Sequence, residues 1–235
     1  MIPQMWLTLW MVLCVCSWLI TGKLHMVMQA TKMKINSTVK FCPVPSLSTR
    51  GENLDQQTTT KFITTVTRER WTRGWMAPFW GQAHRHLDYT NEPFNDPLQV
   101  KIWQEGGHDY KKYTGDMIDH KQGCPEWCDD IGRQFPLHDI GTSLYRMAPG
   151  CHLPTHQDTY EAYINFAKCP IESIFRVIIF LEDWQTGHYF EIAETPITQY
   201  KAGDWICWHS DTPHMAVNLG YNDRYTLQIT GWHDN

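Results

Sequence analysis

The sequence contains no long run of basic residues. Its 20 Lys and Arg side chains are outnumbered by 25 Asp and Glu, which gives a formal charge of −5 at pH 7. Because nucleic-acid-binding domains carry a basic patch or stripe, this balance argues against a nucleic-acid partner. The sequence also lacks a closely spaced cysteine framework, since its 8 cysteines are scattered along the chain. Free thiols in a reducing compartment fit this spacing as well as any set of disulfides, and we expect a cytoplasmic location.

Two of the cysteines, Cys124 and Cys128, could supply half of a tetrahedral zinc site. Such a site needs four ligands, and the sequence offers no second cysteine pair placed to complete it. We therefore give more weight to two free thiols than to a structural zinc.

The long apolar run at residues 5–20 lacks features of both a membrane span and a secretory signal. It has 16 residues, whereas a spanning helix needs about 20. No Lys or Arg precedes it, so the basic start of a signal peptide is missing. Residues 1–32 can be an uncleaved anchor, a signal peptide or sequence upstream of the true start. We favour the third reading, with a start at Met26, Met28 or Met33. Membrane contact is expected only if residues 5–20 remain as an anchor.

Residues 33–140 show no sustained helical or strand pattern. We expect an irregular α/β extension that packs on the C-terminal core. Within it, residues 61–73 fit a helix or a strand, and Leu98 to Trp103 indicates a short strand. Residues 115–135, punctuated by Gly and Pro, predict irregular structure.

From Gly141 onward, short β-like runs follow one another, separated by turn signals. The runs are residues 142–147, 174–181, 188–192, 197–200, 205–208 and 224–230, and the turns include Pro149-Gly150 and Ala202-Gly203-Asp204. Residues 158–170 interrupt the series as a loop or short helix. Short strands without intervening long helices are typical of a jelly roll or barrel. We therefore predict a mainly β core of the cupin-like, jelly-roll class over residues 141–235.

The stretch from Pro149 to Asp158 ends in His156-x-Asp158. Residues two apart on an extended segment point to the same side, so this imidazole and carboxylate can hold two positions of one metal ion. The best candidate for a third ligand is His214, in Asp211-Thr212-Pro213-His214-Met215. Two histidines and one carboxylate form the facial triad of non-haem Fe(II) oxygenases, which leaves positions open for a cosubstrate and dioxygen.

The predicted strand at residues 224–230 alternates polar and apolar side chains. One face would carry Arg224, Thr226, Gln228 and Thr230, and the other Tyr225, Leu227 and Ile229. A polar face turned into a β-barrel indicates a ligand, and an Arg beside a Thr hydroxyl suits a carboxylate. A second Arg, Arg176, interrupts an apolar run, where a charge is costly unless paired. It either pairs with a buried Asp or Glu or provides a second contact to an anionic cosubstrate.

These motifs together resemble one family of oxygenases. The stretch from Leu144 to His156 is similar to the first metal-ligand segment of the aspartyl/asparaginyl β-hydroxylase-like 2-oxoglutarate oxygenases. Further similar segments are Phe175-Arg176-Val177-Ile178, Ala202-Gly203-Asp204-Trp205, and Pro213-His214 followed by Asn218 and Arg224. The resemblance covers about residues 141–232 and leaves residues 1–140 without a counterpart.

The resemblance implies a double-stranded β-helix that uses Fe(II), 2-oxoglutarate and dioxygen. By position, it implies that His156 and His214 ligate the metal and that Arg224 and Tyr145 contact the far carboxylate of 2-oxoglutarate. It also implies that Arg176 contacts a carboxylate or the metal-facing end. We add Thr226, whose hydroxyl would lie on the same strand face as Arg224.

Two positions depart from the family pattern. Asp158 stands where the animal peptide-modifying members have Gly, so the triad is complete here and a peptide substrate is less firmly implied. Ile178 stands where those members can place a His near the cosubstrate. The substrate is therefore left open among a peptide side chain, a free amino acid and a small metabolite.

We predict an Fe(II)- and 2-oxoglutarate-dependent hydroxylase. One alternative is a cupin-like metal- or ligand-binding barrel without oxygenase turnover, which has no need for a dicarboxylate anchor such as Arg224 with Tyr145. A second alternative is a jelly-roll interaction domain in which the histidines are incidental and the Trp-rich N-terminal half makes the contacts. A measurement of bound metal would distinguish this interaction domain, which binds none, from the hydroxylase and the metal-binding barrel.

Overall fold

A computed structural model describes residues 56–78, 80–92, 97–108, 115–119 and 123–234. All of them belong to one compact unit, Pro43–Asn235. The apolar run at residues 5–20 and the alternative start positions lie outside the described residues. Within the described part of the chain, no helix is both long and apolar enough to cross a membrane.

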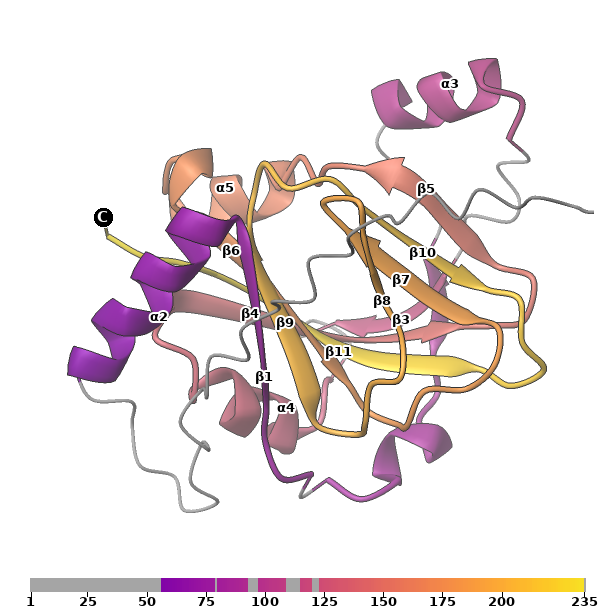
Figure 1. Ribbon diagram of the computed structural model, residues 1–235, viewed down its shortest axis with the longest axis horizontal. Helices are drawn as coiled ribbons and strands as arrows, with labels where there is room; N and C mark the ends of the chain where they lie inside the picture. The colour runs from indigo at the N-terminus through magenta and orange to yellow at the C-terminus, as the bar shows by residue number, and fades with distance from the viewer. Residues whose placement is uncertain (1–55, 79, 93–96, 109–114, 120–122, 235) are drawn as a thin grey trace, which may run out of the picture. The chain divides into compact units, whose positions relative to one another are not determined.

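Two antiparallel sheets form the framework (Figure 1). The larger sheet has the strand order β1-β9-β6-β11-β4-β3-β2. Its strands are β1 (Trp71–Trp75), β2 (Thr90–Glu92), β3 (Gly115–Asp119), β4 (His138–Met147), β6 (Ile174–Phe180), β9 (Asp204–His209) and β11 (Arg224–Trp232). The smaller sheet has the order β5-β10-β7-β8. It is built from β5 (His152–His156), β7 (His188–Ile192), β8 (Thr195–Ile197) and β10 (His214–Asn218).

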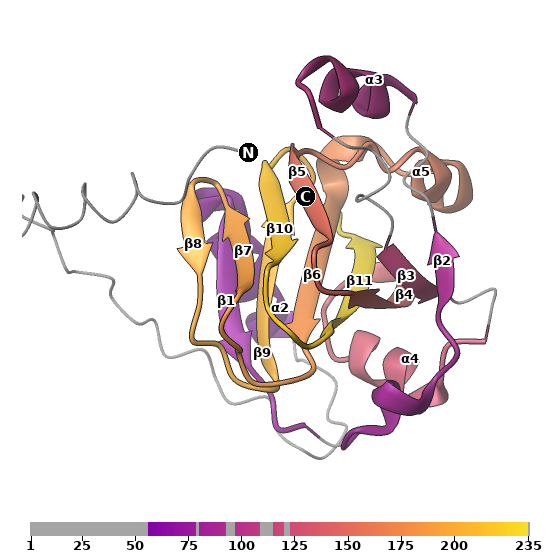
Figure 2. The ribbon, with the colours of Figure 1, turned by 90° about the vertical axis from the view of Figure 1, so that its right-hand side faces the viewer.

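From β4 onward the chain passes back and forth between the two sheets (Figures 1 and 2). Strands β4, β6, β9 and β11 belong to the larger sheet, whereas β5, β7, β8 and β10 belong to the smaller one. This alternation is that of a double-stranded β-helix, or jelly roll. The predicted mainly β, cupin-like class is therefore confirmed.

Helices lie outside the two sheets. Helix α2 (Gln56–Glu69) contacts β1 and β9, and α4 (Glu126–Gly132) contacts β4. Helices α3 (Pro97–Glu105) and α5 (Glu161–Ala167) lie at the end of the molecule opposite α4 in both views (Figures 1 and 2). Short 3-10 turns form η1 (Ala83–His86) and η4 (Ile171–Ser173). Helix α5 falls in the segment predicted to be a loop or short helix.

Several local predictions in the extension were wrong. Leu98 to Trp103 is helical in α3 rather than a strand, which leaves Leu98 and Ile102, one turn apart, exposed and buries Trp103. Residues 115–135 are not irregular, since they contain β3 and α4. Residues 61–73, for which the sequence left helix and strand open, divide between α2 and β1. In the core, the strand predicted at residues 197–200 is replaced by β8 (Thr195–Ile197). The predicted boundary at residue 140 stays a prediction, although β1, β2 and β3 pair within the larger sheet.

The larger sheet separates two apolar layers. On its outer face, Leu227 and Ile229 of β11 pack with residues of α2 and α4, including Ile63, Val66 and Ile131. Full burial of an aliphatic side chain of this size contributes about 1.5–3 kcal/mol. Between the two sheets lie Met147, Phe180, Phe190, Ile192 and Trp208. Because Leu227 and Ile229 face outward, the alternating residues Arg224, Thr226 and Gln228 face the smaller sheet, as predicted.

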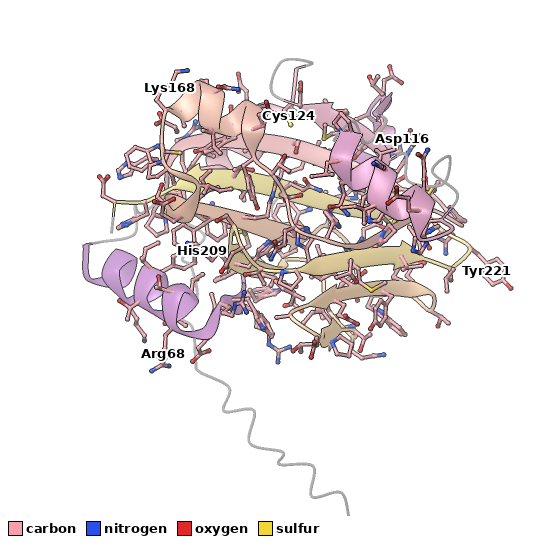
Figure 3. The ribbon with its side chains drawn as sticks, turned by 90° about the horizontal axis from the view of Figure 1, so that it is seen from above. Arg68, Asp116, Cys124, Lys168, His209 and Tyr221 are labelled. Carbon is pink, nitrogen blue, oxygen red and sulfur yellow. The ribbon has the colours of Figure 1, made fainter. Side chains whose placement is uncertain are left out.

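The predicted turn at Ala202-Gly203-Asp204 is present before β9. Gly203 has a φ of 93°, a conformation that favours glycine. A Cβ at this position would lie 2.0 Å from the carbonyl oxygen of Met76, so a side chain cannot be accommodated. The loop between β10 and β11 projects into solvent, where Tyr221 is 98% exposed (Figure 3).

Candidate metal centre

The ends of two neighbouring strands bring the two predicted histidines together. His156 is the last residue of β5 and His214 the first residue of β10, and antiparallel pairing sets them opposite each other. Their ring centroids are 4.4 Å apart. Both side chains are buried. The register of one strand pair is therefore enough to join two residues that are distant in the sequence.

Asp158 lies two residues after β5 and completes the group. Its Oδ1 is 3.6 Å from Nε2 of His156, and its Oδ2 is 3.9 Å from Nε2 of His214. One potential ligand atom from each residue lies within 4.8 Å of the others. Across the described ranges, no other group of three or more His, Cys, Asp or Glu side chains is placed to hold a metal ion. Two imidazoles and one carboxylate fit a first-row divalent metal with open positions.

Backbone carbonyls fix the orientation of both imidazoles. Nδ1 of His156 lies 2.7 Å from the carbonyl oxygen of Pro154, and Nδ1 of His214 lies 3.1 Å from that of Thr212. Because a carbonyl only accepts, Nδ1 donates in each ring and Nε2 keeps a lone pair on the side of Asp158. Burial lowers the pKa of His214 to about 4, which keeps this ring neutral at pH 7. Neutral imidazole is the form that binds a metal.

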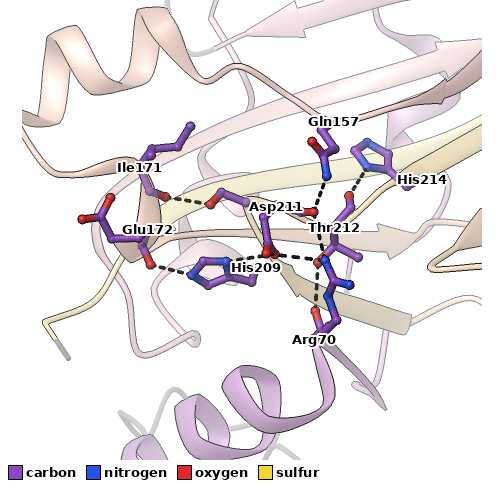
Figure 4. A network of polar contacts seen from close by, with 9 residues as sticks. Arg70, Gln157, Ile171, Glu172, His209, Asp211, Thr212 and His214 are labelled. Atoms are coloured by element: carbon purple, nitrogen blue, oxygen red, sulfur yellow. Dashed lines mark hydrogen bonds and ion pairs between the residues drawn. The ribbon is translucent and has the colours of Figure 1, made fainter.

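The loop before His214 is held by residues from other elements (Figure 4). The carbonyl of Arg70 accepts from the Thr212 hydroxyl at 3.2 Å, and the Arg70 guanidinium donates to the Asp211 carbonyl at 3.3 Å. The side-chain amide of Gln157 donates to the same carbonyl at 2.5 Å. Arg70 has a φ of 65°, which costs a non-glycine residue about 1 kcal/mol or more. The start of β1 and the end of β5 thus position His214, and no sequence signal marked Arg70 or Gln157.

Arg176 pairs with a protein carboxylate. Its Nη2 donates to Oδ2 of Asp158 at 2.9 Å, and its Nη1 donates to Oε1 of Gln228 at 3.4 Å. The sequence left open whether Arg176 pairs with a buried Asp or Glu or contacts an anionic cosubstrate. The structure shows the pairing with Asp158. A contact to a cosubstrate carboxylate stays a prediction.

Arg224 begins β11 and is 3% exposed. Its Cζ lies 5.6 Å from the ring centroid of Phe180 and 5.5 Å from that of Phe190. Nη1 lies 3.9 Å from the Met147 sulfur, whereas Nε and Nη2 have no hydrogen-bond partner among the described residues. No described carboxylate forms an ion pair with it. A buried guanidinium without a counter-ion costs several kcal/mol, so Arg224 is an energetically expensive residue at this position.

Tyr145 and Thr226 lie close to Arg224 on paired strands. Thr226 is opposite Tyr145 in the β4–β11 register and is fully buried. Burial raises the pKa of Tyr145 above its ordinary value, and the nearby Arg224 charge opposes that rise. A Cβ on Gly115 would lie 1.9 Å from the Tyr145 hydroxyl oxygen, so glycine at this position leaves room for Tyr145. The structure thus brings these three predicted residues together.

Phe190 of β7 lies between Arg224 and the group of His156, Asp158 and His214. Its ring centroid is 5.5 Å from Cζ of Arg224 and 6.4 Å from the ring centroid of His214. The guanidinium and the His/Asp group therefore border the same apolar layer between the sheets.

Trp103 is a neighbour of the site that the sequence did not reveal. Its ring packs edge-on against His156, with centroids 5.5 Å apart. The residue was assigned to a predicted strand, and only the helix α3 brings it next to His156, one of the candidate ligands. The zinc reading of Cys124 and Cys128 has no support in the described residues, where both are free thiols outside any group of three potential ligands.

No protein-family model and no curated protein matches this chain. Among solved structures, it is similar to a prolyl-4-hydroxylase of Pseudomonas putida, with 11% identity, a TM-score of 0.47, and coverage of 73% of this chain and 100% of the other. It is also similar to a cupin protein of Bacteroides fragilis, with 14% identity, a TM-score of 0.31, and coverage of 45% and 75%. The Cnp3 cupin domain of Schizosaccharomyces pombe gives 9% identity, a TM-score of 0.33, and coverage of 51% and 65%. Likeness at such identities concerns the fold alone.

Proposed function

We propose that this protein is an Fe(II)- and 2-oxoglutarate-dependent oxygenase that hydroxylates an unactivated C–H bond. One observation carries the proposal. The buried Arg224, which has no counter-ion among the described residues, borders the same apolar layer as the His156, Asp158 and His214 group. A barrel that only binds a metal needs the three ligands but does not need a buried arginine without a counter-ion. An enzyme that binds a metal and a dicarboxylate cosubstrate needs the three ligands and also the arginine.

The three ligands would hold Fe(II) on one face and leave its remaining positions to cosubstrate and dioxygen. When bound, iron with 2-oxoglutarate and dioxygen would supply the oxidising power for hydroxylation, with succinate and carbon dioxide as coproducts. The protein's part is orientation and exclusion of water. The carbonyls of Pro154 and Thr212 turn Nε2 of each ring toward the metal position. Trp208, with its ring centroid 5.0 Å from that of His214, helps to keep water away.

Arg224 would bind the carboxylate of 2-oxoglutarate that lies away from the metal. Its planar guanidinium matches a carboxylate through two parallel hydrogen bonds. The rings of Phe180 and Phe190 flank it, and such an apolar setting strengthens a charged hydrogen bond. The hydroxyls of Tyr145 and Thr226 would add further donors at the same end.

The motif resemblance to the aspartyl/asparaginyl β-hydroxylase-like oxygenases supports this function. Asp158 departs from the peptide-modifying members, so the proposed substrate remains a peptide side chain, an amino acid or a small metabolite. With a formal charge of −5, we propose no nucleic-acid partner. A cytoplasmic location also stays a proposal.

Succinate formation from 2-oxoglutarate tests the proposal. The protein would be supplied with Fe(II), ascorbate and air, and succinate followed by NMR in the wild type, Asp158→Ala and Arg224→Met. We expect slow turnover by the wild type even without a substrate, and loss of turnover in both variants. Arg146→Met is the matched control. It breaks another Arg–Asp pair, Arg146–Asp116 at 2.6 Å, and should keep turnover.

Iron binding without succinate, across a panel of peptides, amino acids and small metabolites, would favour the cupin-like metal-binding barrel instead. Absence of iron binding would favour the interaction domain.

A further inference from the structure

We propose that Arg176 is a positioning residue of the metal centre. It holds one oxygen of Asp158, Oδ2, and so fixes the carboxylate beside the histidines, leaving the other oxygen, Oδ1, free of Arg176 as the ligand atom. The role rests on the proposed metal-dependent function. It differs from the cosubstrate contact that the sequence resemblance implied.

The ion pair between Arg176 and Asp158 is close and sheltered. Nη2 of Arg176 lies 2.9 Å from Oδ2 of Asp158, and the two side chains are 17% and 20% exposed. A charge-assisted hydrogen bond of this length is among the stronger polar contacts in proteins. Asp158 follows the end of β5 and lies outside any strand or helix. The carboxylate therefore depends on side-chain contacts for its orientation.

Arg176 itself is fixed on several sides, which a positioning residue requires. It lies within β6, where its backbone pairs with β9 at Trp208 and with β11 at Thr230. Its Cζ stacks 5.1 Å from the ring centroid of Tyr160. Nη1 also donates to Gln228 at 3.4 Å. The backbone of Arg176 is therefore held in the larger sheet, and its guanidinium is held beside the carboxylate by Tyr160 and Gln228.

The two oxygens of Asp158 are in different surroundings. Oδ2 accepts from Arg176 at 2.9 Å and lies 3.9 Å from Nε2 of His214, whereas Oδ1 lies 3.6 Å from Nε2 of His156 and does not bond to Arg176. A carboxylate with one oxygen held in this way is directed to bind a metal through the other oxygen. A single carboxylate oxygen with two imidazole nitrogens occupies three positions, as a facial triad does.

A titration with Mn(II), followed by calorimetry, tests the role of Arg176. The variants are Arg176→Met and the conservative Arg176→Lys, with Arg146→Met as the matched control. Arg146 also pairs with an aspartate, and its Cζ also lies 5.1 Å from a tyrosine ring, that of Tyr89. We expect Arg176→Met to weaken Mn(II) binding about 10–100-fold, the usual effect of removing a partner of a metal ligand. Arg176→Lys should restore part of the affinity, and Arg146→Met should bind as the wild type does.

Two further measurements separate positioning from other roles. The visible absorption spectrum of bound Co(II) should change in Arg176→Met. Without Arg176, Oδ2 of Asp158 is no longer held, so both carboxylate oxygens can bind the metal. In the folded Arg176→Lys variant saturated with Mn(II), the dissociation constant for 2-oxoglutarate should stay within about threefold of the wild type, since Arg224 provides the anchor. Wild-type Mn(II) affinity and an unchanged Co(II) spectrum in both Arg176 variants would overturn the inference.

The outcomes also distinguish this inference from the proposed function. If the wild type binds Mn(II) but not 2-oxoglutarate, the oxygenase proposal fails while the positioning role stands on the metal affinities. If the wild type binds no metal, both fail.

Discussion

Two arginines reach the layer between the sheets from neighbouring strands, and they differ in what neutralises them. Arg176 of β6 is paired with Asp158 at 2.9 Å. Arg224 of β11 lies between the rings of Phe180 and Phe190 and pairs with no described carboxylate. The protein itself compensates the first charge, whereas no described carboxylate compensates the second. This contrast is the basis for the proposals that Arg176 positions a metal ligand and that Arg224 binds a dicarboxylate.

The largest expected effect comes from removing the paired arginine. Arg176→Met leaves Asp158 buried without its partner, so the free energy of unfolding of the metal-free protein should fall by about 3–5 kcal/mol. Urea unfolding followed by circular dichroism measures this loss. A free energy of unfolding equal to that of the wild type would mean that the Arg176–Asp158 ion pair does not stabilise the metal-free protein.

Removing the unpaired arginine should have the opposite effect on stability. Arg224→Met replaces an uncompensated buried charge by an apolar side chain, so the metal-free protein should become more stable by about 1 kcal/mol or more. Its dissociation constant for 2-oxoglutarate, measured with Mn(II) bound, should rise about 100-fold, from a loss of about 2–3 kcal/mol. A less stable variant with unchanged 2-oxoglutarate binding would contradict the assignment of Arg224.

A smaller effect is expected from crowding Tyr145 away from Arg224. In Gly115→Ala, the new Cβ would lie 1.9 Å from the Tyr145 hydroxyl oxygen, so the ring must move. We expect 2-oxoglutarate to bind about fivefold more weakly, corresponding to about 1 kcal/mol for one hydrogen bond. Gly141→Ala, on the same strand as Tyr145 and with open space around the added methyl group, is the control. Equal affinities in the two variants would remove Tyr145 from the cosubstrate site.

The smallest effect should come from replacing both members of the ion pair. Asp158→Leu with Arg176→Met exchanges two buried charges for apolar groups, which is often neutral for stability. The double variant should therefore unfold within about 1 kcal/mol of the wild type in the absence of metal, and it should bind no Mn(II) tightly. If its loss of stability instead equals that of Arg176→Met alone, the cost of the single change does not arise from an orphaned carboxylate.

The jelly-roll class and the closeness of His156 to Asp158 could be predicted because their signals are local. Short alternating runs and turn residues mark the strands, and His156-x-Asp158 places two ligands on one side of an extended segment. The extension was harder to predict. In residues 98–103, Leu98, Val100 and Ile102 alternate with polar residues, which gave a misleading strand pattern. The helix α3 instead buries Trp103 against His156 and leaves Leu98 and Ile102 exposed.

The sequence by itself determined which side chains of β11 share a face, because alternation is a property of the extended backbone. It also indicated that His156 and Asp158, two residues apart, could lie side by side. Only the tertiary structure decided that Arg176 pairs with Asp158, that Arg224 has no such partner among the described residues, and that Gly115 leaves room for Tyr145. These outcomes depend on which strands become neighbours and in what register. Ion pairing and close packing act over a few ångströms in space, whatever the separation of the residues along the chain.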